Sequence, residues 1–210
     1  NFNHALVSFP IISPFYTLTN FLAQHFFNVG MRMDLFILSD FGLKTVVADY
    51  SLSQKIILTI ISTVVSITQV LSPAYTHIKT KAGVMKEFKH SMIYLLIPTA
   101  LFLSLSFIPA PLYKLIFTSK FIDTPLFSAH LGIVYSLFCL GQVFMLFLLY
   151  TFRKPSYLLM SNIAFFLVVT AACYKLIPIY KGSGAIIAIG LGFVTVIALQ
   201  AVGFVKEYRK

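Results

Sequence analysis

The sequence predicts an all-α, polytopic membrane protein with six membrane-spanning helices, and two observations predict this fold class. Of the 210 residues, 59% are hydrophobic and 10% are charged, whereas soluble domains carry about 25% charged residues. The charges are also clustered, so that six stretches of at least 20 residues contain no Asp, Glu, Lys or Arg. About 20 apolar residues in a helix cross a hydrocarbon core about 30 Å thick. The expected spans are 7–40, 52–75, 91–113, 130–150, 156–177 and 184–205.

This composition excludes a secreted disulfide scaffold, a nucleic-acid-binding module and a soluble enzyme. Cys139 and Cys173 both fall inside expected spans, so we expect them to be small packing residues rather than a disulfide or a metal site. No metal-ligand spacing, Ser–His–Asp pattern or glycine-rich phosphate motif is present. We therefore expect no cofactor, no nucleic-acid partner and no enzymatic activity.

The net charge of +10 is attributed mainly to membrane topology, because positively charged loops remain on the cytoplasmic side. With the N-terminus inside, nine Lys and Arg lie in inner loops and six in outer loops. The inner set is Lys79, Lys81, Lys86, Lys89, Arg153, Lys154, Lys206, Arg209 and Lys210, and the outer set is Arg32, Lys44, Lys114, Lys120, Lys175 and Lys181. We expect a multi-pass protein of the cytoplasmic (inner) membrane with both termini cytoplasmic.

The sequence also predicts the character of two connecting segments. Residues 76–90 are expected to form a basic inner loop, which is either simply solvated or in contact with anionic lipid head groups. Residues 114–130 mix apolar side chains with Asp123 and Pro125, which indicates a short interfacial segment on the outer side.

Polar side chains recur at helical spacing in the first two expected spans. In the first span they are Thr17, Asn20, Gln24, Asn28 and Arg32, followed by Asp34; in the second they are Lys55, Thr59, Ser62, Ser66 and Gln69. Residues three or four positions apart share one helix face, and polar groups in a membrane point to the bundle interior or to a water-filled cavity.

Hydrogen bonding between helices is the simpler explanation for an isolated polar residue, and we assign it to Gln142 and Asn162. His25 is either a hydrogen-bonded interior residue or a proton carrier. For the two stripes we favour a cavity lining. The candidate site residues are Asn20, Gln24, Asn28, Arg32, Asp34, Lys55, Ser62, Ser66 and Gln69, with Arg32 and Lys55 for an anion and Asp34 to orient Arg32.

Several short motifs, in order, resemble the polysaccharide flippases of the Wzx type, which belong to the MATE-like (MOP) exporter superfamily. They are the Asp34–Gly42 passage with Val47–Ile56, the Leu71-Ser-Pro-Ala-Tyr run, the Tyr113–Phe121 segment, in which Thr118 replaces a common Gly, and Leu176–Ala188. The resemblance covers nearly the whole chain. Val47, Ala48 and Asp49 depart from the Val-Gly pair that is usual in the family.

The resemblance implies a twelve-helix transporter in two lobes, of which this chain is the C-terminal one. The first residue is Asn rather than Met, and we expect the N-terminal lobe to be missing from the sequence. The implied function is translocation of undecaprenyl-pyrophosphate-linked oligosaccharide for polysaccharide (O-antigen) biosynthesis. The implied partners are membrane lipids, the N-terminal lobe, a polysaccharide polymerase and glycosyltransferases. The alternatives are a drug/cation antiporter of the same superfamily and a peptidoglycan lipid-precursor flippase.

Overall fold

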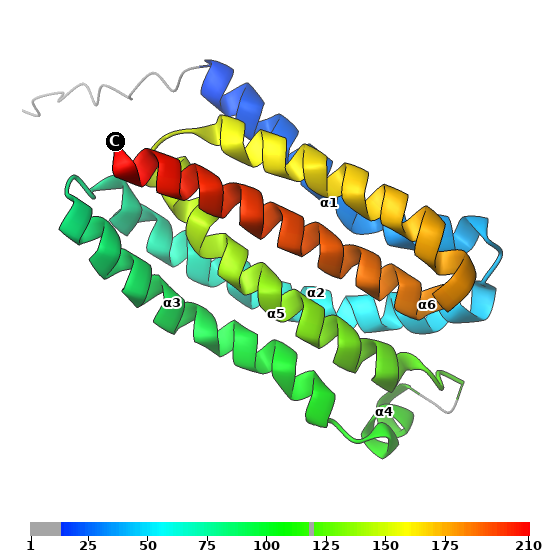
Figure 1. The fold of residues 1–210 in the computed structure, drawn as a ribbon. Helices are drawn as coiled ribbons and strands as arrows, with labels where there is room; N and C mark the ends of the chain where they lie inside the picture. Colours follow the sequence, from blue (N-terminus) through cyan, green and yellow to red (C-terminus); the bar gives the residue numbers. More distant parts are fainter. Residues whose placement is uncertain (1–13, 118–119) are drawn as a thin grey trace, which may run out of the picture.

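The computed structural model describes residues 14–117 and 120–210, and within them the chain forms helices joined by short connections, without a strand (Figure 1). The first seven residues of the expected first span, 7–13, lie outside this part, as does Thr118. The elements are α1 (Pro14–Asp40), α2 (Lys44–Thr76), α3 (Lys81–Ser104), the 3-10 turn η1 (Leu105–Phe107), α4 (Ala110–Phe117), α5 (Thr124–Leu146), the π-helical turn η2 (Phe147–Thr151) and α6 (Pro155–Arg209).

Four of these helical stretches are long and apolar enough to cross a membrane, namely α2, α3 with η1, α5 with η2, and α6. The chain is therefore an all-helical, multi-pass membrane protein. Helix α1 has 27 residues but is not among the four, because Asn20, Gln24, His25 and Asn28 interrupt its apolar sequence. The polar stripe that distinguishes α1 in the sequence also lowers the mean hydropathy of this helix.

Helix α6 is 55 residues long because two helical stretches meet at Lys181, where the backbone leaves the helical region (φ 50°, ψ −126°). The two halves run in opposite directions, side by side (Figure 1). A Cβ atom at Gly184 would overlap the carbonyl oxygen of Leu176, so only glycine allows the chain to turn this closely. The reversal separates the expected spans 156–177 and 184–205.

The third expected span, 91–113, begins and ends later in the sequence than helix α3 with η1. Residues 76–90 are not a loop. Helix α3 already starts at Lys81, since the Thr80 side chain accepts a hydrogen bond from the Gly83 amide at 3.1 Å and caps its first turn. The connection before it is only residues 77–80. After η1 the chain forms the separate eight-residue helix α4, in the region where the sequence predicts the start of the interfacial segment 114–130. The end of this predicted segment is wrong, because α5 already begins at Thr124.

Aromatic rings dominate the centre of the bundle. Phe193 lies between Tyr135, Phe138 and Phe165, with ring centroids 5.1, 5.6 and 5.5 Å away. Around this centre α1 packs mainly against α6, and α2 and α3 pack against α5. Cys139 and Cys173 are buried and free, which confirms the expectation that they are packing residues.

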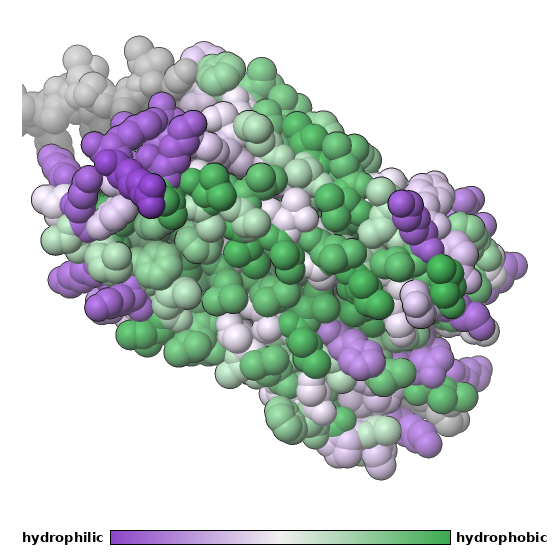
Figure 2. All heavy atoms as spheres, in the orientation of Figure 1, coloured by the Kyte–Doolittle hydropathy of each residue, from purple (hydrophilic) through white to green (hydrophobic). Residues whose placement is uncertain are grey.

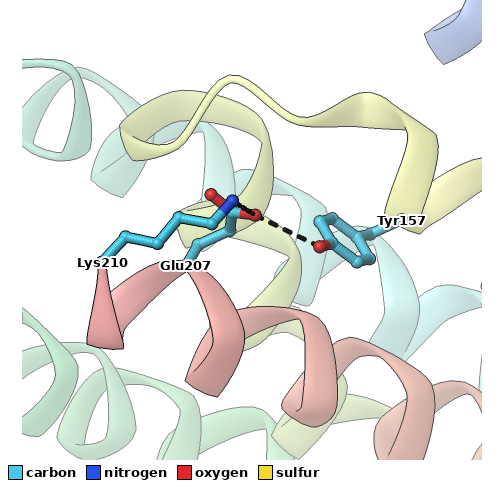
Figure 3. Close-up of polar contacts among 3 residues, drawn as sticks. All are labelled: Tyr157, Glu207 and Lys210. Atoms are coloured by element: carbon cyan, nitrogen blue, oxygen red, sulfur yellow. Dashed lines mark hydrogen bonds and ion pairs between the residues drawn. The ribbon is translucent and has the colours of Figure 1, made fainter.

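The α2–α3 and α5–α6 connections lie at the same end of the bundle as the C-terminus (Figure 1). Hydrophilic residues gather at this end and at the opposite end, whereas the middle of the visible face is mostly apolar (Figure 2). The Lys81 amine lies 5.7 Å from the ring centre of Tyr208. Glu207 accepts hydrogen bonds from Lys210 (2.8 Å) and Tyr157 (3.1 Å), so the two ends of α6 are tied together (Figure 3).

Candidate functional site

A pocket of about 290 Å³ lies between α1, α2, α5 and both halves of α6. We call it the amide pocket, because five amide side chains line it: Gln24, Asn28, Gln142, Asn162 and Gln200. Thr68 of α2 adds a hydroxyl group, and the remaining lining is apolar, including the rings of Phe27, Phe138 and Phe193. None of the described residues that line the pocket carries a charge.

The packing of the helices explains where the pocket forms. Helix α1 packs on α6 and helix α2 on α5, so that α5 and α6 together close the space between the first two helices. Gly141 of α5 also lines this space, where a Cβ atom would lie 3.4 Å from the Ile197 side chain.

Two of the amides are held by hydrogen bonds within the protein. Asn162, which is 5% exposed, donates to the Ala23 carbonyl of α1 at 2.9 Å. Gln200, which is 4% exposed, donates to the Ser161 hydroxyl at 3.2 Å, and its buried side-chain oxygen has no partner among the described residues. Such an oxygen is costly to leave without a donor.

The other three amides are available to a ligand. Within residues 14–117 and 120–210, no hydrogen bond to the protein involves the side chains of Gln24, Asn28 or Gln142. Gln24 and Asn28 are exposed and Gln142 is half-buried. The interhelical hydrogen bond expected for Asn162 is present in the structure, whereas Gln142 makes none there and instead faces the pocket.

Asp34 is not placed as the sequence predicts. Its carboxylate is completely buried and accepts hydrogen bonds from the Tyr50 hydroxyl and the Gln54 amide, both at 2.6 Å, and from the Leu35 amide at 2.7 Å. In the part of the chain that the structure describes, no ion pair joins Asp34 to Arg32. Asp34 therefore connects α1 to α2 and lines neither the pocket nor the exposed stripe.

The stripe on α2 lies beside the pocket rather than inside it. Ile61, Val65 and Thr68 line the pocket, and the stripe residues Ser62, Ser66 and Gln69 each follow one position later, about 100° further around the helix. All three are exposed, as is Lys55. The two serine hydroxyls bond to carbonyl groups of their own helix, Ser62 to Thr59 at 2.6 Å and Ser66 to Ser62 at 2.9 Å.

The α1 stripe is divided between the pocket and the surface. Gln24 and Asn28 line the pocket, and Arg32 is exposed one turn further along the helix. Asn20 is half-buried, and its side-chain oxygen has no partner among the described residues. His25 is exposed and stacks on Phe21, with ring centroids 5.8 Å apart.

Gln200 is absent from the site residues that the sequence predicts, and Gln142 and Asn162 are not predicted to lie beside the first span. These three amides are far apart in the sequence, and each is isolated in its own span, so periodicity could not group them. The available signal was chemical: each is an amide in an otherwise apolar span, where polar groups are costly.

The described residues contain no group of His, Cys, Asp and Glu side chains that could hold a metal ion. Comparison of the chain with protein-family models, curated proteins and solved structures finds no significant match.

Proposed function

We propose that the chain is one lobe of a membrane transporter that moves an undecaprenyl-pyrophosphate-linked oligosaccharide from the inner to the outer leaflet. The observation that carries this proposal is an uncharged amide pocket, lined by α1, α2, α5 and α6, together with exposed cations on α1 and α2. A glycan requires many donors and acceptors without charge, and a pyrophosphate requires cations. The amides of α1, α5 and α6 supply the first, and Arg32 and Lys55 supply the second.

The exposed polar stripes support a surface that faces water or a partner lobe rather than lipid. A polar residue in hydrocarbon is costly, yet Asn28, Arg32, Lys55 and Ser66 are all exposed. In the proposed transporter this face borders a central cavity, and a second, N-terminal lobe covers it. The apolar residues exposed on α3, among them Ile93 and Leu96, face the membrane lipids.

In the proposed topology α1, α2, α3, α5 and the two halves of α6 are the six spans of the lobe. The end with the C-terminus (Figure 1) is cytoplasmic in this topology, in agreement with the positive-inside rule. The basic residues of its connections and of the C-terminus are Lys79, Arg153, Lys154, Lys206, Arg209 and Lys210. Alternating access by rocking of the two lobes then presents the cavity to each side of the membrane in turn. A polysaccharide polymerase and glycosyltransferases are the expected partners of such a flippase.

One observation favours the alternative of a drug/cation antiporter. Such a transporter uses an acidic residue inside the membrane to bind the coupling ion, and Asp34 is a completely buried carboxylate. However, the carboxylate already accepts three hydrogen bonds and lies outside the amide pocket. We therefore prefer the glycolipid substrate.

Reconstitution of the full-length protein in proteoliposomes distinguishes the two functions. We expect accelerated movement between leaflets of a fluorescent undecaprenyl-pyrophosphate-linked oligosaccharide, and no movement of a cationic dye such as ethidium. Transport of the dye driven by a sodium or proton gradient, without transport of the glycolipid, would establish the antiporter instead.

A further inference from the structure

We infer that the amide pocket binds one sugar ring of the substrate, the pyranose attached directly to the pyrophosphate. This inference rests on the proposed function and assigns a residue set, Gln24, Asn28, Gln142, Asn162 and Gln200, to one part of the substrate. Gln142, Asn162 and Gln200 are not on the two stripes found in the sequence.

The size of the pocket fits a single ring. Its volume of about 290 Å³ lies at the lower end of the range of about 300–1,000 Å³ that pockets for small ligands cover. A pyranose is a small ligand of this kind, and a disaccharide has about twice as many heavy atoms. The rest of an oligosaccharide would therefore remain in the cavity outside the pocket.

The chemistry of the lining fits a sugar and does not fit a free anion. Each amide offers two N–H donors and one carbonyl acceptor, so that the pocket can both donate to and accept from sugar hydroxyl groups. Phe27, Phe138 and Phe193 provide apolar surface for the C–H groups of the ring. A phosphate would find no cation among the described lining residues.

The Gln200 oxygen gives an independent reason to expect a hydroxyl donor in the pocket. The side chain is 4% exposed and lines the pocket, and its amide nitrogen is already bonded to Ser161. Its oxygen has no partner within residues 14–117 and 120–210, although nearly all buried polar groups in proteins have one. A sugar hydroxyl group in the pocket can supply the missing donor.

The position of Arg32 identifies which ring enters. Arg32 follows Asn28 by four residues on α1, which places it about 6 Å further along the helix axis, and it is exposed and outside the lining. A ring seated beside Asn28 thus lies within one turn of a cation that suits the pyrophosphate. The ring next to the pyrophosphate is the one that can lie beside Asn28 while the pyrophosphate lies near Arg32.

The first test measures binding of lipid-free probes to the full-length protein in nanodiscs by ligand-observed NMR. The probes are the methyl glycosides of glucose, galactose and N-acetylglucosamine. We expect at least one to bind, with a dissociation constant that rises about fivefold to tenfold in Gln200→Met and in Gln142→Met. Gln142 has no hydrogen bond within the described residues, so its substitution tests the pocket without removing an internal contact.

Lys89→Met is the control, because Lys89 is exposed on α3, outside the pocket and outside both polar stripes, and it should leave the dissociation constant unchanged. Failure of all three glycosides to bind a protein that transports the lipid-linked substrate would overturn the inference and retain the proposed function. Glycoside binding that depends on Gln142 and Gln200 supports the pocket even without glycolipid transport, and only the proposed function then fails.

The second test concerns the identity of the ring. The 1-phosphate of the best-binding sugar should bind more tightly than its methyl glycoside, and Arg32→Ala should abolish this gain while Lys114→Ala retains it. Equal affinity of the phosphate and the glycoside for the unmodified protein would overturn the assignment to the ring beside the pyrophosphate.

Discussion

The Tyr50 hydroxyl donates a hydrogen bond of 2.6 Å to the Asp34 carboxylate, and both side chains are completely buried. The Gln54 amide completes the contact at 2.6 Å on the same oxygen. Since Asp34 is on α1 and the other two residues are on α2, this cluster fixes the joint between the two helices that border the amide pocket. It gives a buried carboxylate a structural role.

Tyr50→Phe removes one of these donors and should lower the free energy of unfolding by about 1–3 kcal/mol, because the buried carboxylate is then incompletely hydrogen-bonded. The measurement is the apparent midpoint of thermal unfolding in detergent. Tyr94→Phe, at an exposed position on α3, is the control and should leave the midpoint unchanged. Equal midpoints for Tyr50→Phe and the unmodified protein would show that the cluster does not stabilise the joint.

Asp49 of α2 caps the N-terminus of α5. Its carboxylate accepts hydrogen bonds from the Thr124 amide at 3.1 Å and from the Thr124 hydroxyl at 2.7 Å. Asp49→Ala should cost about 0.5–2 kcal/mol and increase amide exchange in the first turn of α5, measured by hydrogen–deuterium exchange. Asp49→Asn retains an acceptor and should exchange more slowly than Asp49→Ala; the reverse order would contradict the capping role.

Lys181 has a backbone conformation that favours glycine (φ 50°, ψ −126°). Lys181→Gly should therefore raise the free energy of unfolding by about 1 kcal/mol. Lys175→Gly, inside the first half of the same helix, should lower it by about 1 kcal/mol. Chemical denaturation of both variants checks the pair, and destabilisation by Lys181→Gly would mean that the reversal in α6 has a different geometry.

Gly132 of α5 lies against α3, where a Cβ atom would overlap the carbonyl oxygen of Phe102. Gly132→Ala should destabilise the protein by about 1–3 kcal/mol, because the backbone of α3 must shift. At Gly190 the nearest neighbour of a Cβ atom is the Val134 side chain at 3.5 Å, an ordinary contact, so Gly190→Ala should be tolerated. Thermal unfolding of the two variants tests this difference, and equal midpoints would exclude the close α3–α5 approach.

The sequence predicts the helical class and much of the order of the elements, because charge-free stretches of span length are a local signal. Helix ends were harder to predict. The start of α3 at Lys81 depends on the Thr80 cap, which charge counting cannot detect, and the expected loop 76–90 was wrong for this reason.

The candidate site was only partly predictable, because spacing along one helix does not show which helices pack together. Helical spacing grouped Gln24 with Asn28, and both line the pocket. Spacing could not place Gln142, Asn162 and Gln200 beside them, because these amides meet only after four helices have packed. Spacing also could not show that Asp34 faces Tyr50 rather than Arg32. Adjacent positions on a helix point in different directions, so a small error in the orientation of the helix changes the predicted neighbours of a side chain.

In the proposed transporter the polar face of α1 and α2 carries the glycolipid, with Arg32 and Lys55 in contact with its pyrophosphate. The most direct measurement is the flipping rate of fluorescent undecaprenyl-pyrophosphate-linked oligosaccharide in proteoliposomes that contain the full-length Arg32→Ala/Lys55→Ala variant. A second double variant, Lys114→Ala/Lys120→Ala, removes two exposed cations elsewhere in the chain. We expect the first to flip at least about tenfold more slowly, since a hydrogen bond to a charged group contributes about 1.5–3 kcal/mol, and the second to match the unmodified protein. An unchanged rate in the Arg32/Lys55 variant would contradict the account.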